Sequence, residues 1–246
     1  MRELQVDKMD YFLKIVTVGN MFTNCGIVGN PETMECVVID PGTEAGKIKK
    51  EVADSGYTPV AILLTHGHFD HIGAVNELRK EWDVEVFAGA KEVELLGDSV
   101  LNVSSQAWGA CTVAPDKTLS DGDVIEAGGM FITIFEVPGH TVGSICFLFP
   151  LYGIVFSGDT LFADSIGRTD LPTGEPKVLI ESLVEKLFAL PDDIQVFPGH
   201  GPSTNIGYER RNNPYLKELL RDSVQYIDES DIKKRKFPFF RKKKTD

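Results

Sequence analysis

The chain contains five histidines, His66, His68, His71, His140 and His200. Three of them, together with Asp70, place four metal-competent side chains within the six residues 66–71. Imidazole nitrogens and carboxylate oxygens are ligands that Zn²⁺, Fe and Mn accept in proteins. A cluster of this density therefore predicts a metal-dependent active site.

The cluster directly follows a short apolar run at residues 60–64, which we expect to form a buried strand. On a helix, side chains two residues apart point about 200° apart, so His66 and His68 could not share an ion there. An extended loop places both on one side, while Asp70 and His71 turn toward a neighbouring position. The pattern thus predicts two adjacent ion positions on a loop, which differs from the helical His-Glu-x-x-His zinc site.

Three further ligand candidates, His140, Asp159 and His200, each come at the end of a strand-like run. The runs occupy residues 131–139, 153–158 and 194–199. A glycine or small residue stands next to each candidate, which suits a crowded site where backbone approaches metal closely. We therefore expect several strands to deliver these polar groups to one edge.

The ordered set His-x-His-x-Asp-His, His, Asp, His resembles the metallo-β-lactamase superfamily over residues 10–215. Within it, the sequence GDTLFADSIGRTD at residues 158–170 resembles the bacterial glyoxalase II-like hydrolases, and related persulfide dioxygenases carry a similar Gly-Arg-Thr-Asp. The resemblance implies an α/β fold of four layers, αββα, with the metal site at the edge of a two-sheet sandwich.

The resemblance also implies two divalent metal ions, with Zn²⁺ as the first candidate and Fe or Mn as alternatives. The implied ligands form two groups that share one carboxylate: His66, His68 and His140 for the first ion, Asp70, His71 and His200 for the second, and Asp159 between them. Asp70 and Asp159 are the implied catalytic carboxylates, and a metal-bridging hydroxide would be the nucleophile. β-Lactamases of this fold usually carry Cys or Ser at the position of Asp159, which argues against antibiotic hydrolysis.

The implied reaction is hydrolysis of a small-molecule thioester, as in hydroxyacylglutathione hydrolases. A thiolate with a pKa of about 8.5 leaves with little proton donation, whereas an amine leaving group needs a general acid. One alternative is an iron-dependent persulfide dioxygenase, whose implied iron ligands are His66, His140 and Asp159. Others are a lactonase, a nuclease, which the net charge of −12 disfavours, and a metal-binding module without catalysis. No nucleic acid is required by the leading reading.

Arg168 is the candidate for substrate binding. Eukaryotic-type glyoxalase II holds glutathione with a Lys and a Tyr after the bridging Asp, whereas this chain has Arg168 and Asp170 in those places. The guanidinium could pair with a substrate carboxylate. The alternative is a salt bridge with Asp170 or Asp164 that orders the loop.

Charge is segregated along the chain. Residues 233–246 contain eight Lys or Arg and one Asp, a net charge of +7, although the whole chain carries −12. We expect one metallo-β-lactamase-fold domain over residues 1–230 and a flexible basic-aromatic tail at 231–246. The tail either makes weak contact with an anionic membrane or nucleic acid, or it solubilises the protein or folds back on the acidic body.

No apolar run approaches 18 residues and residues 1–10 are charged, so we expect a cytoplasmic protein. The four cysteines form no Cys-x-x-Cys pair and are expected as reduced thiols. The pattern predicts further strands at residues 11–18, 25–28, 35–39 and 84–88, and helices at 44–55, 73–82, 91–96 and 176–190. Asp121-Gly122 predicts a hairpin turn.

Overall fold

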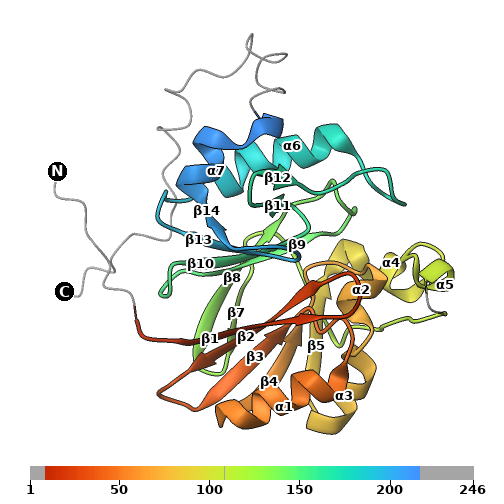
Figure 1. Cartoon of the computed structure of the whole chain (residues 1–246), viewed down its shortest axis with the longest axis vertical. Helices are drawn as coiled ribbons and strands as arrows, with labels where there is room; N and C mark the ends of the chain where they lie inside the picture. The colour runs from red at the N-terminus through yellow and green to blue at the C-terminus, as the bar shows by residue number, and fades with distance from the viewer. Residues whose placement is uncertain (1–8, 108, 217–246) are drawn as a thin grey trace.

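The computed structural model describes residues 9–107 and 109–216 (Figure 1). Two six-stranded sheets pack face to face, and helices cover the outer face of each sheet. This is the four-layer αββα architecture that the sequence predicts. The predicted domain end at residue 230 and the tail at 231–246 lie outside the described residues.

The first sheet takes the first half of the chain in sequence order: β1 (Phe12–Val18), β2 (Thr23–Asn30), β3 (Glu35–Ile39), β4 (Thr58–Leu63), β5 (Glu85–Gly89) and β6 (Lys117–Leu119). β1, β2 and β3 are antiparallel neighbours, whereas β3 to β6 run parallel. Parallel neighbours need a crossover connection, usually a helix. α1 (Ala45–Ser55) makes the first crossover and α3 (Val75–Trp82) lies in the second.

The second sheet has the spatial order β14 (Thr204–Asn205), β13 (Gln195–Pro198), β10 (Ile154–Gly158), β9 (Ile145–Phe149), β8 (Met130–Glu136) and β7 (Val124–Ala127). β9 is antiparallel to both β8 and β10, and β10 is parallel to β13. Consequently β8, β10 and β13 run in one direction and end at the same edge of the sheet.

Alternating side chains of the strands supply the core between the sheets and the contacts with the helices. In β4, Ala61 and Leu63 face the opposite sheet, whereas Ile62 and the following Leu64 face the helices of the first sheet. Successive strand residues point to opposite faces, so a strand covered on both faces is a continuous apolar run. This explains the run at residues 60–64.

The remaining elements are short and lie mostly around the strand ends: α2 (Phe69–Ile72), η1 (Ala90–Glu92), α4 (Val93–Gly97), α5 (Ser104–Ala107), β11 (Leu161–Phe162), β12 (Ser165–Ile166), α6 (Pro176–Glu185), η2 (Leu187–Ala189) and α7 (Ile206–Asn212). The helix predicted at 176–190 is present as α6 followed by η2. Its buried Leu179, Leu183 and Leu187 pack on the outer face of the second sheet.

The hairpin predicted at Asp121-Gly122 is wrong. These residues form a turn, but the turn leads from β6 in the first sheet to β7 in the second. The hairpin between β7 and β8 turns at Gly128 and Gly129, both with positive φ. A local turn signal fixes the chain reversal and not the sheet to which the next strand belongs.

No helix in the described part of the chain combines the length and hydropathy needed to cross a bilayer. The four cysteines are free thiols, and three of them are buried.

Candidate metal centre

The ligand candidates meet where strands of both sheets end. His140, Asp159 and His200 follow β8, β10 and β13, which share one direction and one edge. The 66–71 cluster follows β4 of the other sheet. Backbone hydrogen bonds join the two edges: the Ile145 N–H donates to Thr65 O at 2.8 Å, and the Asn24 N–H donates to Gly199 O at 2.7 Å.

His66, His68 and His140 form one group whose ligand atoms lie within 4.8 Å of one another. His68 Nδ1 and His140 Nε2 are 2.9 Å apart, and the ring of His66 lies within 5.0 Å of both other rings between centroids. All three side chains are buried. His66 and His68 lie on the extended loop before α2, as the sequence predicts.

Asp70, His71 and His200 form the second group. Asp70 Oδ2 lies 3.2 Å from His200 Nε2 and 3.7 Å from His71 Nε2, and the two imidazole nitrogens are 3.4 Å apart. Asp70 and His71 lie on α2, a single helical turn that begins just after His68. This change from extended to helical backbone turns them away from the first group.

Asp159 lies between the two groups. Its Oδ2 is 3.7 Å from His140 Nε2 and 3.4 Å from His200 Nε2, and its Oδ1 is 3.4 Å from His71 Nε2. The seven residues are thus the two groups and the shared carboxylate that the resemblance implies.

The donor geometry fits metal ions. Tetrahedral coordination at about 2.0–2.1 Å places two ligand atoms about 3.3 Å apart, and the separations above lie around this value. His66 Nε2 and Asp159 Oδ1 are buried atoms without a hydrogen-bond partner. Buried polar atoms are nearly always paired, so these two atoms fit ligands that await an ion.

Three histidines are oriented through their Nδ1 atoms. His71 Nδ1 lies 3.1 Å from Asp40 Oδ2, His140 Nδ1 lies 2.7 Å from Arg168 O, and His200 Nδ1 lies 3.0 Å from Met21 O. A carboxylate or carbonyl only accepts, so each Nδ1 carries the proton and each Nε2 keeps its lone pair for an ion.

These orienting groups were not predicted from the sequence. Asp40 carried a usable signal, because it follows the apolar strand β3 directly and is buried. It also accepts hydrogen bonds from the backbone and hydroxyl of Thr65. The carbonyls of Met21 and Arg168 carried none, because every residue has a carbonyl.

The first group holds neutral imidazoles. Burial lowers the pKa of His66 well below its usual range and that of His68 to about 3, and it also lowers the pKa of His140. Neutral imidazole is the form that binds metal.

The second group holds negative potential that favours a cation. Burial opposes charge on all its members, but the charges of Asp70 and Asp159 raise the pKa of His71 well above its usual range. Hydrogen bonds to the same carboxylates raise the pKa of His200 to about 9. The charge of His71 and the hydrogen bond from His200 lower the pKa of Asp70 to about 2.

Glycines permit the close approach of backbone to these ligands. A Cβ on Gly199, the residue before His200, would lie 2.1 Å from Asp159 Oδ1 and 2.6 Å from His71 Cε1. A Cβ on Gly158, the residue before Asp159, would lie 2.4 Å from Thr65 Oγ1, and its φ is +51°. No side chain fits at either position without moving a group of the centre.

The Arg168 side chain does not lie among the ligands. It makes two hydrogen bonds to Asp170, of 2.7 and 2.6 Å, and both side chains are more than half exposed. Asp164, the other predicted partner, instead accepts from the hydroxyl of Tyr208. The salt bridge weighed as an alternative for Arg168 is therefore present.

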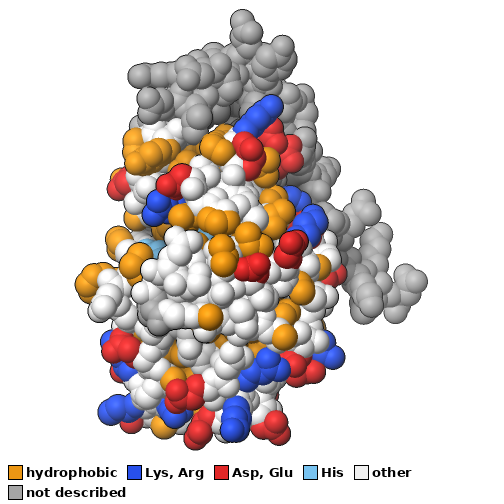
Figure 2. Space-filling view, turned by 90° about the vertical axis from the view of Figure 1, so that its right-hand side faces the viewer, with side chains coloured by type: hydrophobic (Ala, Val, Ile, Leu, Met, Phe, Trp, Pro, Cys, Tyr) orange, Lys and Arg blue, Asp and Glu red, His pale blue; other side chains and the backbone are white. Residues whose placement is uncertain are grey.

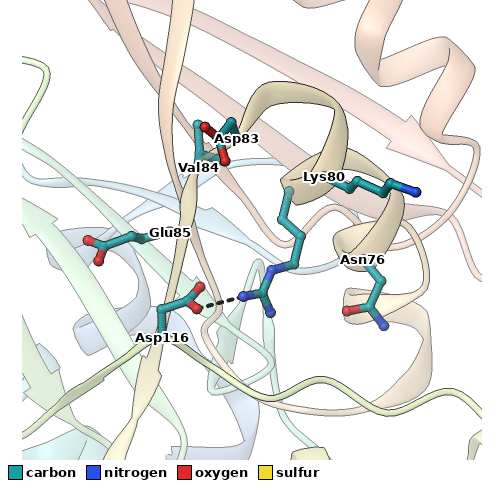
Figure 3. A pocket seen from close by; sticks show the side chains of 7 residues that line it. Asn76, Lys80, Asp83, Val84, Glu85 and Asp116 are labelled. Carbon is teal, nitrogen blue, oxygen red and sulfur yellow. Dashed lines mark hydrogen bonds and ion pairs between the residues drawn. The ribbon is translucent and has the colours of Figure 1, made fainter.

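A surface pocket of about 450 Å³ shares no residue with the centre (Figure 3). It lies beside α3 and β5, and Arg79 in it donates to Asp116 and to Ala114 O. On another face a histidine side chain reaches the surface beside hydrophobic side chains (Figure 2). His200 is partly exposed, with 26% of its side chain accessible.

Comparisons of the sequence identify its relatives. The Metallo-beta-lactamase superfamily pattern matches residues 18–200. The chain is 41% identical over 184 residues to the probable metallo-hydrolase YqgX of Bacillus subtilis, covering 74% of this chain and 87% of that protein. It is 35% identical over 208 residues to hydroxyacylglutathione hydrolase GloC of Haemophilus influenzae, covering 83% and 97%.

Solved structures agree. The BLEG-1 B3 metallo-beta-lactamase has a TM-score of 0.79 at 38% identity, covering 83% of this chain and 99% of that one. TTHA1623 in a di-iron-bound form has 0.73 at 38%, covering 82% and 100%. ETHE1 from Myxococcus xanthus has 0.70 at 26%, covering 91% and 95%. The matched residues, the αββα fold and the paired histidine–aspartate groups show that this chain belongs to the metallo-β-lactamase superfamily.

Proposed function

We propose that this metallo-hydrolase binds two divalent metal ions, with Zn²⁺ as the first candidate, and hydrolyses a thioester. The observation that carries the proposal is the placement of Asp159 between two groups of buried ligands. Such paired ions, when bound, lower the pKa of water to about 7 and polarise a substrate carbonyl.

The residues of the chain orient and charge this centre. Asp40 and the carbonyls of Met21 and Arg168 hold three imidazoles with Nε2 free. Asp70 and Asp159 are ionised and give the centre two negative charges to offset those of the ions. Thr23 donates its hydroxyl proton to Asp70 Oδ2 at 3.0 Å, which fixes that carboxylate.

A thioester suits the centre better than an amide. The thiolate product has a pKa of about 8.5 and leaves without a proton, whereas an amine must be protonated. The ligand groups contain no thiol, and burial raises the pKa of Cys25 and Cys146. A cysteine nucleophile is therefore not part of the proposal. The similarity to hydroxyacylglutathione hydrolase GloC supports this substrate class.

An iron-dependent persulfide dioxygenase is the second candidate. The similarity to a di-iron-bound structure supports iron, and the similarity to ETHE1 is consistent with this alternative. Its single iron would use His66, His140 and Asp159, a set of two histidines and one carboxylate.

Metal content and two variants test the proposal. We expect about two metal equivalents per chain by elemental analysis. His200→Ala should leave one equivalent and lower thioester hydrolysis by on the order of 10²-fold or more, because hydrolysis needs both positions. Full hydrolysis in His200→Ala with one ion bound would contradict the two-metal proposal. Oxygen consumption with a persulfide that survives His200→Ala but not His66→Ala would identify the dioxygenase.

A further inference from the structure

A fully buried carboxylate outside the ligand groups connects two of the ligand loops. Glu92, the last residue of η1, accepts a hydrogen bond at Oε1 from the Gly67 N–H at 2.8 Å. Its Oε2 accepts from the Gly143 N–H at 2.8 Å and from the Thr141 hydroxyl at 3.0 Å. These three donors are all neutral.

The three donors lie on the loops that carry the first ligand group. Gly67 stands between His66 and His68, and Thr141 directly follows His140. One side chain therefore joins the His66–His68 loop, which follows β4 of the first sheet, to the His140 loop, which follows β8 of the second. The joined loops hold His68 Nδ1 and His140 Nε2 2.9 Å apart.

Backbone packing places Glu92 against both loops. A Cβ on Gly143 would lie 2.2 Å from Glu92 N, and a Cβ on Gly67 would lie 2.7 Å from Leu95 Cδ2 of α4. The segment of η1 and α4 is thus wedged between the loops. Thr141 also shares a 2.6 Å hydrogen bond with Ser144, which extends the network toward β9.

A buried carboxylate is costly unless donors compensate its lost hydration. Burial raises the pKa of Glu92, and the hydrogen bonds from Gly67, Thr141 and Gly143 oppose this change. An apolar residue here would leave two backbone N–H groups unpaired in the interior. Glutamine would present an amide N–H₂ to one of the two donor sets, so neither substitution preserves the contacts.

We propose that Glu92 is a positioning residue for the first metal position, because its carboxylate sets the spacing between the His66–His68 loop and the His140 loop. This inference rests on the proposed metal centre and on no particular substrate. Partners that orient ligands typically change metal affinity 10–100-fold when they are mutated.

The test measures Co²⁺ binding by full-length protein in a His200→Ala background, so that the first position dominates the reading. Glu92→Gln should weaken this affinity about 10-fold to 100-fold, and Glu92→Ala should weaken it more. Thr141→Val, which removes one donor and nearly keeps the side-chain volume, should weaken it less. In metal-free protein, the amide protons of Gly67 and Gly143 should exchange with solvent faster in Glu92→Ala.

Asn30→Ala is the matched control. Asn30 is a buried side chain at the far end of β2 from Thr23, and it donates to Gly128 O and Gly129 O. This variant should lower the melting temperature without changing Co²⁺ affinity. Unchanged affinity in both Glu92→Gln and Thr141→Val, or an equal loss in Asn30→Ala, would overturn the proposal. Because binding and not turnover is measured, failure of thioester hydrolysis would leave the result intact.

Discussion

Single atoms decide the chemistry of this centre. His140 contacts the Arg168 carbonyl with Nδ1 and faces His68 and Asp159 with Nε2. A ring turned the other way would lose this hydrogen bond and its Nε2 proton would point at the ligand group. Acceptors beside the ligands therefore matter as much as the ligands themselves.

Substrate recognition by Arg168 is a separate question at this scale. If the guanidinium leaves Asp170 to bind an anionic substrate, Arg168→Ala should raise KM for a carboxylate-bearing thioester and leave a neutral thioester nearly unaffected. Steady-state kinetics with both substrates checks this. Asp170→Ala is the matched control, since it breaks the same ion pair but keeps the cation. Equal losses on both substrates in Arg168→Ala would indicate that the pair only orders the loop.

The buried thiol of Cys36 predicts a pH effect on stability. Burial raises its pKa from 9.0 to about 12, so between these values the unfolded chain loses a proton that the folded protein keeps. The stability that this provides is complete below pH 9 and is lost as pH rises toward 12.

We therefore expect the free energy of unfolding to fall with pH over this interval. Cys36→Ala should reduce the slope, as measured by urea unfolding at several pH values. Cys25 and Cys146, whose pKa values are also raised by burial, should maintain part of it. An unchanged slope in Cys36→Ala would contradict the assignment.

At the scale of elements, the centre depends on strands that end together. β8, β10 and β13 share a direction only because β9 reverses between β8 and β10. β13 then places Gly199 and His200 against Asp159, with the start of β2 bridged to His200. The ends of these elements are therefore packed more tightly than ordinary loops.

Gly199→Ala tests this packing. Its Cβ would meet Asp159 Oδ1 at 2.1 Å, so either the carboxylate or the end of β13 must move. We expect metal content to fall below two equivalents and hydrolysis to fall about 10-fold or more, measured by elemental analysis and initial rates.

Gly46→Ala is the control, because its Cβ would meet nothing within 4 Å on α1. It should keep both metal ions and raise the free energy of unfolding by up to about 1 kcal/mol. Full metal content and activity in Gly199→Ala would show that the site tolerates the shift.

At the scale of the whole molecule, charge is distributed unevenly. The chain carries −12 although residues 233–246 hold eight basic residues and one acidic one. An acidic body repels polyanions, whereas a basic segment with aromatic residues attracts anionic surfaces. That segment lies outside the described residues, so its role remains a prediction.

Deletion of residues 233–246 should leave turnover of a small thioester intact and remove salt-sensitive binding to anionic vesicles or nucleic acid. Vesicle co-sedimentation and nucleic-acid gel shifts at two ionic strengths check this. If the full-length protein binds neither at low salt, the tail does not mediate such contact.

The sequence by itself determined the ligand types, the strand before the 66–71 cluster and the superfamily. Ligand spacing and apolar runs are local properties, so β3, β4 and β8 could be predicted closely. The extended backbone at His66–His68 also followed locally, because a helix would separate the two side chains.

Only the tertiary structure decided which groups orient and join those ligands. Asp40, the Met21 carbonyl and Glu92 lie 31, 179 and 25 residues from the groups that they bind. Such contacts depend on which strand ends converge, and a backbone carbonyl has no sequence signature. For the same reason the turn at Asp121-Gly122 was assigned to a hairpin, although it joins two sheets. Local patterns specify elements, while non-local packing specifies their partners.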